Sequence, residues 1–302
     1  MNNLHVFFTI QTLGPLLFLP VVIVAAVVEG VALAWRGPGY DWRAALASLA
    51  DALGREYLVH RYLGYSIAVP VIFFAWTHRL TTLPLSGPVA IGVLFLGQEF
   101  CYYWFHRASH RIRWFWATHA IHHSSNELNL SAAFRFGWFD RIAGGGIFYA
   151  PLVWLGFPPI AVFAVLTLNL LYQFPLHATW IPKLGWLEYV LNTPSHHRVH
   201  HAANLAYLDA NYGGVLIIFD RLFGTFVAER DDLPCRYGLV KPLRTRNPFV
   251  FNFFEWRALL RDLVGARSWR DRAFFLFGPP GWRPDGMGAT TEDLRRVAAA
   301  AE

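Results

Sequence analysis

The 302-residue chain has few charged residues and very little cysteine. Charged side chains make up 15% of it, against about 25% in an ordinary soluble domain. Its two cysteines, Cys101 and Cys235, form neither a CxxC pair nor a zinc knuckle, which argues against a disulfide framework and favours two structural thiols. Hydrophobic residues make up 55% of the chain, and together these proportions predict a membrane protein.

The net charge of +6 is spread among apolar segments. This distribution predicts a basic face toward anionic lipid headgroups and argues against nucleic acid as a partner. The 13 tryptophans suit anchoring at the membrane surface. No basic stretch precedes the first apolar run, which is too long for a signal peptide, so we expect a retained anchor.

Five apolar stretches are candidates for crossing a membrane, for which a helix needs about 20 residues. They cover approximately residues 4–33, 64–76, 85–104, 137–156 and 158–176. The first contains Gly14, Pro15 and Pro20 and is expected to be kinked or broken. The last two meet at Phe157-Pro158-Pro159 as a hairpin that either crosses or re-enters the bilayer. The predicted fold class is all-α, a polytopic membrane helical bundle.

Arginine positions predict how such a bundle is oriented. If there are five crossings, one side carries Arg36, Arg43, Arg55, Arg61, Arg107, Arg111, Arg113 and Arg135. Arg79 lies on the other side, so the first side should be cytoplasmic. Every clustered histidine then falls in a cytoplasmic, histidine-rich helical cap. We expect an anchor and interfacial region at 1–84, a catalytic region at 85–230 and a cytoplasmic extension at 231–302. The excess of Arg over Lys suggests a GC-rich bacterial source, and hence a bacterial inner membrane.

Ten of the 13 histidines fall between positions 106 and 201, in spaced patterns. The patterns are His106-x3-His110, His119-x2-His122-His123, a lone His177, and His197-x2-His200-His201 preceded by His196. Positions i, i+3 and i+4 share one face of a helix, so each motif can direct its rings toward one metal region. His196 could replace His197 as a ligand, but His197 reproduces the spacing of the middle motif. We assign ordinary core or surface roles to His5, His60 and His78.

Nine or ten histidines are too many for one structural zinc, which takes four ligands. They fit two metal ions with several imidazoles each, which suggests non-haem di-iron oxygen chemistry. No flavin, nicotinamide or haem motif is present, so electrons must come from an external donor. A membrane metal carrier or sensor is an alternative, disfavoured because the histidines gather at one face rather than deep within the spans. A zinc hydrolase would need an HExxH-like base, which the sequence lacks.

Several polar residues are candidates for supporting such a site. Glu99, seven residues before His106, either orients the ligand rings or is an interfacial acid. Asp209 and Asn211 follow the last motif, and they either support the ligand rings or stabilise a turn. Two amides that share a face with His177 either line a substrate channel or bond between helices, namely Asn169 and Gln173.

The histidine patterns lie inside longer motifs: FCYYWFHR at 100–107, NLLYQF at 169–174, LNTPSHHRVHH at 191–201 and NYGGVLIIFD at 211–220. In these the chain resembles the fatty acid hydroxylase/sterol desaturase superfamily over roughly residues 85–285. Within it, the motifs look like those of the ether-lipid-cleaving branch, the alkylglycerol monooxygenases. The resemblance implies two iron ions, O2 as oxidant and a membrane lipid as substrate.

The resemblance also implies a reaction. Hydroxylation of the carbon next to an ether oxygen gives a hemiacetal, which collapses to an aldehyde and a glycerol derivative. A sterol or fatty-acyl desaturase or hydroxylase remains the alternative, because the same histidines serve those outcomes. Animal alkylglycerol monooxygenases carry Glu where this chain has Arg111. If that Glu serves the tetrahydropterin reductant or the metal site, this chain could use another external reductant or another lipid. The sequence does not indicate an oligomeric state.

Overall fold

The computed structural model describes residues 2–37, 39–59 and 66–300, with side chains from Phe18 onward except that of Leu58. Within these ranges the elements are helical, and β pairing is limited to the bridges Leu191–Leu216 and Ala202–Tyr237. The α-helices are α1 (Asn2–Arg36), α2 (Trp42–Leu53), α4 (Ala68–Thr77), α5 (Pro88–Arg111), α6 (Arg113–His122), α7 (Asp140–Ala143), α8 (Ala150–Leu155), α9 (Pro159–Gln173), α10 (Pro194–His200), α11 (Ile218–Phe223), α12 (Pro248–Gly265), α13 (Trp269–Phe277) and α14 (Thr291–Ala299).

Shorter helical turns connect them. They are the π turn η1 (Gly54–Val59) and the 3-10 turns η2 (Leu130–Phe134), η3 (Gly145–Tyr149), η4 (Phe174–His177), η5 (Gly185–Tyr189) and η6 (Leu205–Tyr207). The predicted all-α class is confirmed for the described residues.

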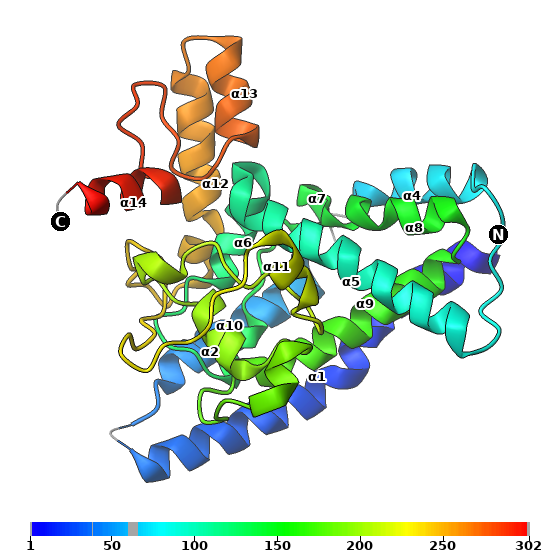
Figure 1. Ribbon diagram of the computed structural model, residues 1–302, viewed down its shortest axis with the longest axis horizontal. Coiled ribbons are helices and arrows are strands. Elements are labelled where there is room, and N and C mark those ends of the chain that lie inside the picture. Colours follow the sequence, from blue (N-terminus) through cyan, green and yellow to red (C-terminus); the bar gives the residue numbers. More distant parts are fainter. Residues whose placement is uncertain (1, 38, 60–65, 301–302) are drawn as a thin grey trace.

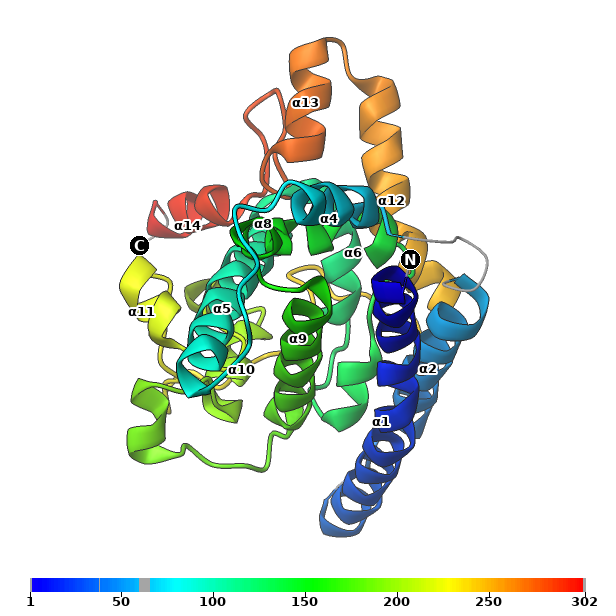
Figure 2. The same ribbon diagram turned by 90° about the vertical axis from the view of Figure 1, so that its right-hand side faces the viewer.

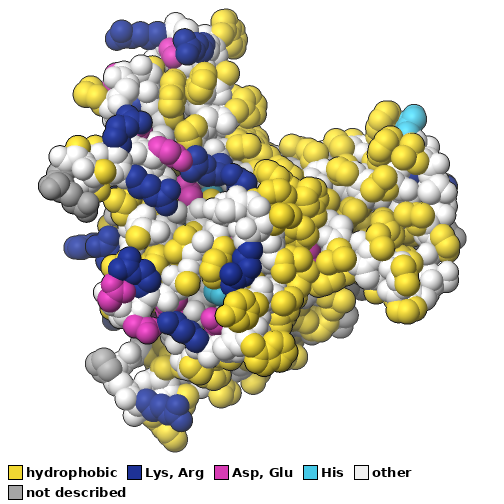
Figure 3. Space-filling view, viewed as in Figure 1, with side chains coloured by type: hydrophobic (Ala, Val, Ile, Leu, Met, Phe, Trp, Pro, Cys, Tyr) yellow, Lys and Arg dark blue, Asp and Glu magenta, His cyan; other side chains and the backbone are white. Residues whose placement is uncertain are grey.

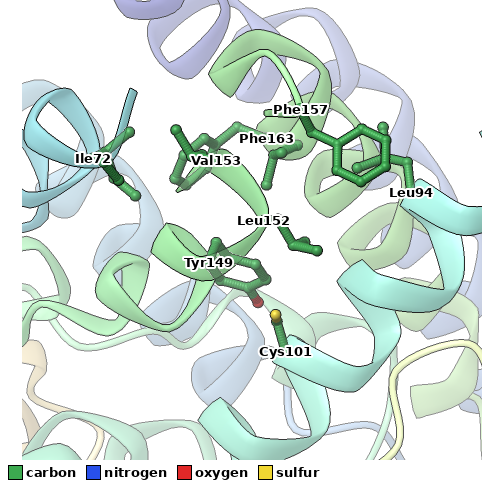
Figure 4. Close-up of a cluster of buried hydrophobic side chains, with 10 residues drawn as sticks. Ile72, Leu94, Cys101, Tyr149, Leu152, Val153, Phe157 and Phe163 are labelled. Atoms are coloured by element: carbon green, nitrogen blue, oxygen red, sulfur yellow. The ribbon is translucent and has the colours of Figure 1, made fainter. Parts of the chain in front are cut away.

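A stem of apolar helices projects from a larger body (Figure 1). The stem consists of α4, η3, α8 and the N-terminal parts of α5 and α9. Figure 2 looks toward its end. Inside it, Ile72 of α4, Leu94 of α5, Val153 of α8 and Phe163 of α9 pack into one buried cluster (Figure 4). Prolines near the first turns of α5, α8 and α9 suit helix starts, where a missing N–H costs no hydrogen bond.

Two helical segments are long and apolar enough to cross a membrane: Phe18–Arg36 and Pro159–His177. Two apolar segments are shorter, Ala68–Thr77 and Gly145–Leu155. The expected span at 137–156 is instead broken into α7, η3 and α8, with Gly144 in a left-handed conformation between the first two. The structure therefore supports fewer long spans than the five expected, and the polytopic arrangement and the cytoplasmic face stay predictions.

Two buried carboxylates join helices of the body to segments far away in the sequence. Glu29 of α1 is buried, and its carboxylate accepts hydrogen bonds from the Leu130 N–H and the Trp180 indole. Asp51 of α2 accepts hydrogen bonds from the Asn252 side chain of α12 and from the Phe136 N–H. Segments distant in sequence are thus joined by hydrogen-bonded buried carboxylates, each costly to leave unpaired.

Residues 248–277 form a helical hairpin, α12 and α13, that rises from the body at a steep angle to the stem (Figures 1 and 2). It packs against α6 through Ala117, Leu259 and Phe275. Helix α14 follows and begins with a capping box between Thr290 and Asp293. The expected division into three regions stays a prediction, but α12 to α14 pack directly on elements of the expected catalytic region.

The stem gives a testable prediction at Gly156, the residue that ends α8. Its φ is +122°, and an added Cβ would lie 2.4 Å from the Thr81 carbonyl oxygen. We expect Gly156→Ala to cost about 2–5 kcal/mol from backbone strain and overpacking. Gly185→Ala is the matched control, because its φ is +62° with open space around it; it should cost only about 1–2 kcal/mol. Thermal denaturation in detergent measures both, and equal losses would contradict the prediction.

Candidate metal centre

Nine buried or partly buried histidines gather into two groups. Within each group, one ring nitrogen per residue lies within 4.8 Å of those of all the others. We call group A the set His106, His110, His119, His123 and His200. We call group B the set His122, His177, His197 and His201. The two groups adjoin, since the His123 and His201 rings stack with centroids 4.4 Å apart.

Each HxxHH motif divides its histidines between the two groups. In α6 the i, i+4 pair His119 and His123 joins group A, whereas His122 joins group B. In α10 the pair His197 and His201 joins group B, whereas His200 joins group A. The expectation that each motif directs all its rings to one metal region is therefore corrected: a pair one turn apart serves one group, and the residue at i+3 serves the other.

Helices α5 and α9 complete the groups. His106 and His110 stand near the C-terminal end of α5 and join group A. His177 ends the turn η4 that continues α9, and it joins group B. Each group therefore receives histidines from the C-terminal end of one long helix: the HxxxH pair from α5 in group A, and the lone histidine after α9 in group B.

Backbone carbonyl groups fix the orientation of several rings. The Nδ1 atom of His106 lies 2.9 Å from the Tyr212 carbonyl oxygen, and that of His200 lies 2.9 Å from the Ala210 oxygen. In group B, His122 Nδ1 lies 3.1 Å from the Arg135 oxygen, and His177 Nδ1 lies 3.1 Å from the Gln173 oxygen. Each Nδ1 must donate to its carbonyl, which leaves Nε2 without a proton and facing the group, as a metal ligand requires.

The spacing of Nε2 atoms fits a shared central ion. His119 Nε2 lies 3.1 Å from both His106 Nε2 and His110 Nε2, and 3.2 Å from His123 Nε2. One ring nitrogen carries either one proton or one lone pair, so it cannot make three such hydrogen bonds at once. A metal–nitrogen bond of about 2.1 Å would place two ligands at right angles about 3.0 Å apart.

Group B has the same spacing. His197 Nε2 lies 3.2 Å from His177 Nε2 and 3.0 Å from His201 Nε2. His200 Nε2, at the edge of group A, is buried and makes no hydrogen bond. These donors fit two metal ions.

Burial keeps the ligand candidates neutral. Desolvation, aided by the neighbouring imidazoles, holds the pKa of His119, His123 and His201 well below the usual value of 6.5. Neutral imidazole is the form that binds a metal. Moreover α5, α6, η4 and α10 all end at the site, and C-terminal helix ends carry partial negative charge that favours a cation.

Other histidines lie apart. His196 belongs to neither group, although its side chain is buried; its ring packs on Phe226, and its Nε2 lies 3.9 Å from a Glu188 carboxylate oxygen. His78 is exposed and stacks on Phe74. The assignments for His60 and for the side chain of His5 fall outside what the structure describes.

Glu99 does not contact the histidine rings in the way expected. Its buried carboxylate accepts hydrogen bonds from the Asn169 amide and, at 2.8 Å each, from the Val215 and Leu216 N–H groups. Asn169 in turn bonds Gln173, which accepts a hydrogen bond from Tyr102. Of the two roles left open for Asn169 and Gln173, the structure shows bonding between helices.

Asp209 stands against group A. Its Oδ1 lies 3.7 Å from His110 Nδ1, and its Oδ2 accepts a 2.7 Å hydrogen bond from Arg111. Burial alone would raise the pKa of Asp209, but His110 and Arg111 lower it to about 2. Arg111 also pairs with Glu292 of α14 and so joins the site to the C-terminal helix.

Asn211 holds the loop after α10. Its side-chain amide donates hydrogen bonds to the carbonyl oxygens of His196 and Val227, and its side-chain oxygen accepts one from the Val227 N–H. It bonds no ring of either group. The sequence reasoning missed Asp220, which accepts hydrogen bonds of 2.7 Å from the Tyr212 and Gly213 N–H groups and so supports the carbonyl that orients His106. Only its place in the NYGGVLIIFD motif signalled it.

Comparison with known proteins agrees with this geometry. Residues 91–225 match the family model described as fatty acid hydroxylase. The alkylglycerol monooxygenase of Xenopus tropicalis is 38% identical over 256 residues, which are 84% of this chain and 56% of that protein. The one of Homo sapiens is 43% identical over 221 residues, 72% of this chain and 48% of that protein.

A bacterial relative is more distant. The ornithine lipid hydroxylase OlsE of Rhizobium tropici is 32% identical over 143 residues, 47% of this chain and 43% of that protein. The chain spans about half the length of the alkylglycerol monooxygenases it matches. No solved structure matches it. The resemblance to the superfamily, and within it to alkylglycerol monooxygenases, is confirmed.

The contact between Asp209 and His110 predicts a role in holding the ring. We expect Asp209→Asn to lower metal retention by about 10–100-fold, the usual cost of losing a partner that orients a ligand. Asp231→Asn is the matched control, because that carboxylate is 93% exposed and pairs only with Lys183 at the surface. Metal analysis after dialysis against a chelator measures the effect, and equal retention in both variants would count against this role.

Proposed function

We propose that the chain is a membrane-bound oxygenase that holds two iron ions in groups A and B and hydroxylates a C–H bond of a lipid with O2. The observation that carries the proposal is the pair of adjoining histidine groups, in which His119 Nε2 makes more close contacts with other Nε2 atoms than hydrogen bonding explains. His106, His110, His119, His123 and His200 would hold one ion, and His122, His177, His197 and His201 the other. His196 lies apart and is not proposed as a ligand.

The donors of both groups are imidazoles, which suit iron, zinc and copper alike. Iron is proposed because the relatives are named as monooxygenases, whose chemistry requires a metal that activates O2. The bound pair would supply the oxidising power that breaks an unactivated C–H bond. The protein's residues supply the rest: carbonyl groups fix the rings, helix ends offset the positive charge, and the surrounding apolar side chains exclude water.

The substrate we propose is an alkylglycerol ether, the lipid named by the animal relatives. Hydroxylation of the carbon bonded to the ether oxygen consumes O2, two electrons and two protons and releases water. The resulting hemiacetal collapses to an aldehyde and a free glycerol hydroxyl group. The ornithine lipid hydroxylase relative supports a second candidate, hydroxylation of another polar lipid without cleavage.

The stem suggests how lipid reaches the site. It exposes Phe73, Phe74, Val89, Ile91 and Leu168, a surface suited to acyl chains. If it is embedded in the bilayer, α5 and α9 lead from the lipid directly to His106 and His177. We propose that the histidine site lies on the cytoplasmic side of the membrane, where a soluble electron donor such as tetrahydropterin can reach it.

Metal content tests the histidine groups. We expect anaerobically purified protein to contain two irons per chain and His122→Ala to lose iron, because His122 is one of the four histidines of group B. His78→Ala, a change at an exposed histidine outside both groups, should keep full iron. A single tightly bound zinc without oxygen consumption would refute the oxygenase.

Turnover tests the substrate. Reconstituted protein is supplied with alkylglycerols, sterols or acyl lipids, each with and without tetrahydropterin, and O2 uptake and aldehyde release are followed. We expect aldehyde from alkylglycerols alone, in proportion to the O2 consumed. A hydroxylated lipid without aldehyde would instead favour the second candidate.

A further inference from the structure

The hairpin of α12 and α13 carries an apolar face that no other described part of the chain covers. On α12 the exposed side chains Leu260 and Val264 lie one turn apart, with Val264 77% exposed. Phe249 and Phe253 continue this stripe toward the body, where their rings contact Trp138 and Phe139. The other side of the helix packs on the body, where Phe251 and Leu259 are buried. Helix α12 is thus apolar on both its inner and outer sides.

Helix α13 continues this surface. Trp269, Ala273 and Phe277 follow one another at four-residue intervals, and Trp269 is 82% exposed. Together with Val264 they line a shallow groove of about 590 Å³ between the two helices. The stripe on α12 and the row on α13 therefore form one surface, which we call the hairpin face.

The side of the hairpin nearer the stem is apolar. Figure 3 shows hydrophobic side chains along the side of the hairpin nearer the stem and continuing onto it, whereas Lys and Arg gather on the side of the body away from the stem. The hairpin itself lies across the stem direction (Figure 1). A bilayer entered by the stem would therefore run along the hairpin face.

The charges of the hairpin suit a lipid surface. Residues 248–277 contain five arginines, Arg257, Arg261, Arg267, Arg270 and Arg272, against the three acids Glu255, Asp262 and Asp271. Asp262 is already paired with Arg113 and Arg261. Exposed aromatic residues flanked by arginine are typical of helices lying in the membrane interface, where anionic headgroups attract the cations. The core of a protein interface is instead depleted of charge.

We propose that the hairpin face lies flat in the interface of the same bilayer that the stem enters, with Leu260, Val264 and Trp269 among the lipids and the arginines at the headgroups. This inference rests on the membrane placement in the proposed function. The hairpin packs on α6, which carries His119 and His122, so its docking fixes the distance between the histidine site and the headgroups. Part of the expected cytoplasmic extension is then a membrane-binding element.

Depth-dependent fluorescence quenching tests the inference in the full chain. The protein, with Cys235→Ser and the buried Cys101 retained, is placed in nanodiscs of phosphatidylcholine and phosphatidylglycerol. A bimane label is attached at Leu260→Cys or Val264→Cys. The control label at Asp231→Cys, on the 93% exposed carboxylate, reports water, and a label at Leu168→Cys reports the stem.

We expect lipids with a nitroxide near the headgroup to quench the hairpin labels severalfold more than the Asp231 label, as for a face buried about 5–10 Å into the interface. Water-soluble nickel should show the opposite order. Hairpin labels quenched by nickel as strongly as the control would overturn the inference, as would labels reached by neither quencher, because a protein would then cover the face. In both cases lipid quenching at Leu168 would leave the membrane placement standing. A Leu168 label reached only by nickel would overturn both.

Discussion

Hydrogen bonds from buried imidazoles to backbone carbonyl groups determine how this site is built. Each bond places a proton on Nδ1 and turns Nε2 inward, so the carbonyl positions decide which atoms can meet a metal. The carbonyls of Ala210 and Tyr212 lie on the loop after α10. Asp220 and Glu99 hold that loop by accepting hydrogen bonds from its backbone N–H groups. Neither of these buried carboxylates bonds a ring of either histidine group. These buried polar groups therefore position the histidines indirectly, through the backbone of the loop.

Such indirect support limits what the sequence can predict. The spacing of the histidines correctly indicated an all-helical arrangement that brings nine of them together, because i, i+3 and i+4 positions lie within one turn. It did not reveal that the i+3 ring turns toward a second group, since that depends on where α10 meets α6. His196 also shows this limit: it stands beside His197, yet the packing of α10 turns its ring toward Phe226.

The acids show the same limit. Glu99 lies on the face of α5 that leads to His106, and spacing alone made it a partner for the rings. In the structure its carboxylate instead accepts hydrogen bonds from two backbone N–H groups that lie more than a hundred residues away in sequence. The apolar stretch at 137–156 is not one continuous helix, because hydropathy does not reveal that Gly144 interrupts it. Contacts made across the fold decided each of these outcomes.

The exchange of single histidines between the two HxxHH motifs has a consequence for biosynthesis. While the second motif is still inside the ribosome, the first motif and the HxxxH pair have already emerged, yet group A lacks His200 and group B has only His122 and His177. Group A cannot be completed on the nascent chain until His200 has been made, and group B cannot until His201 has been made. Both then gain their missing members from the same short helix, α10, in a single docking event.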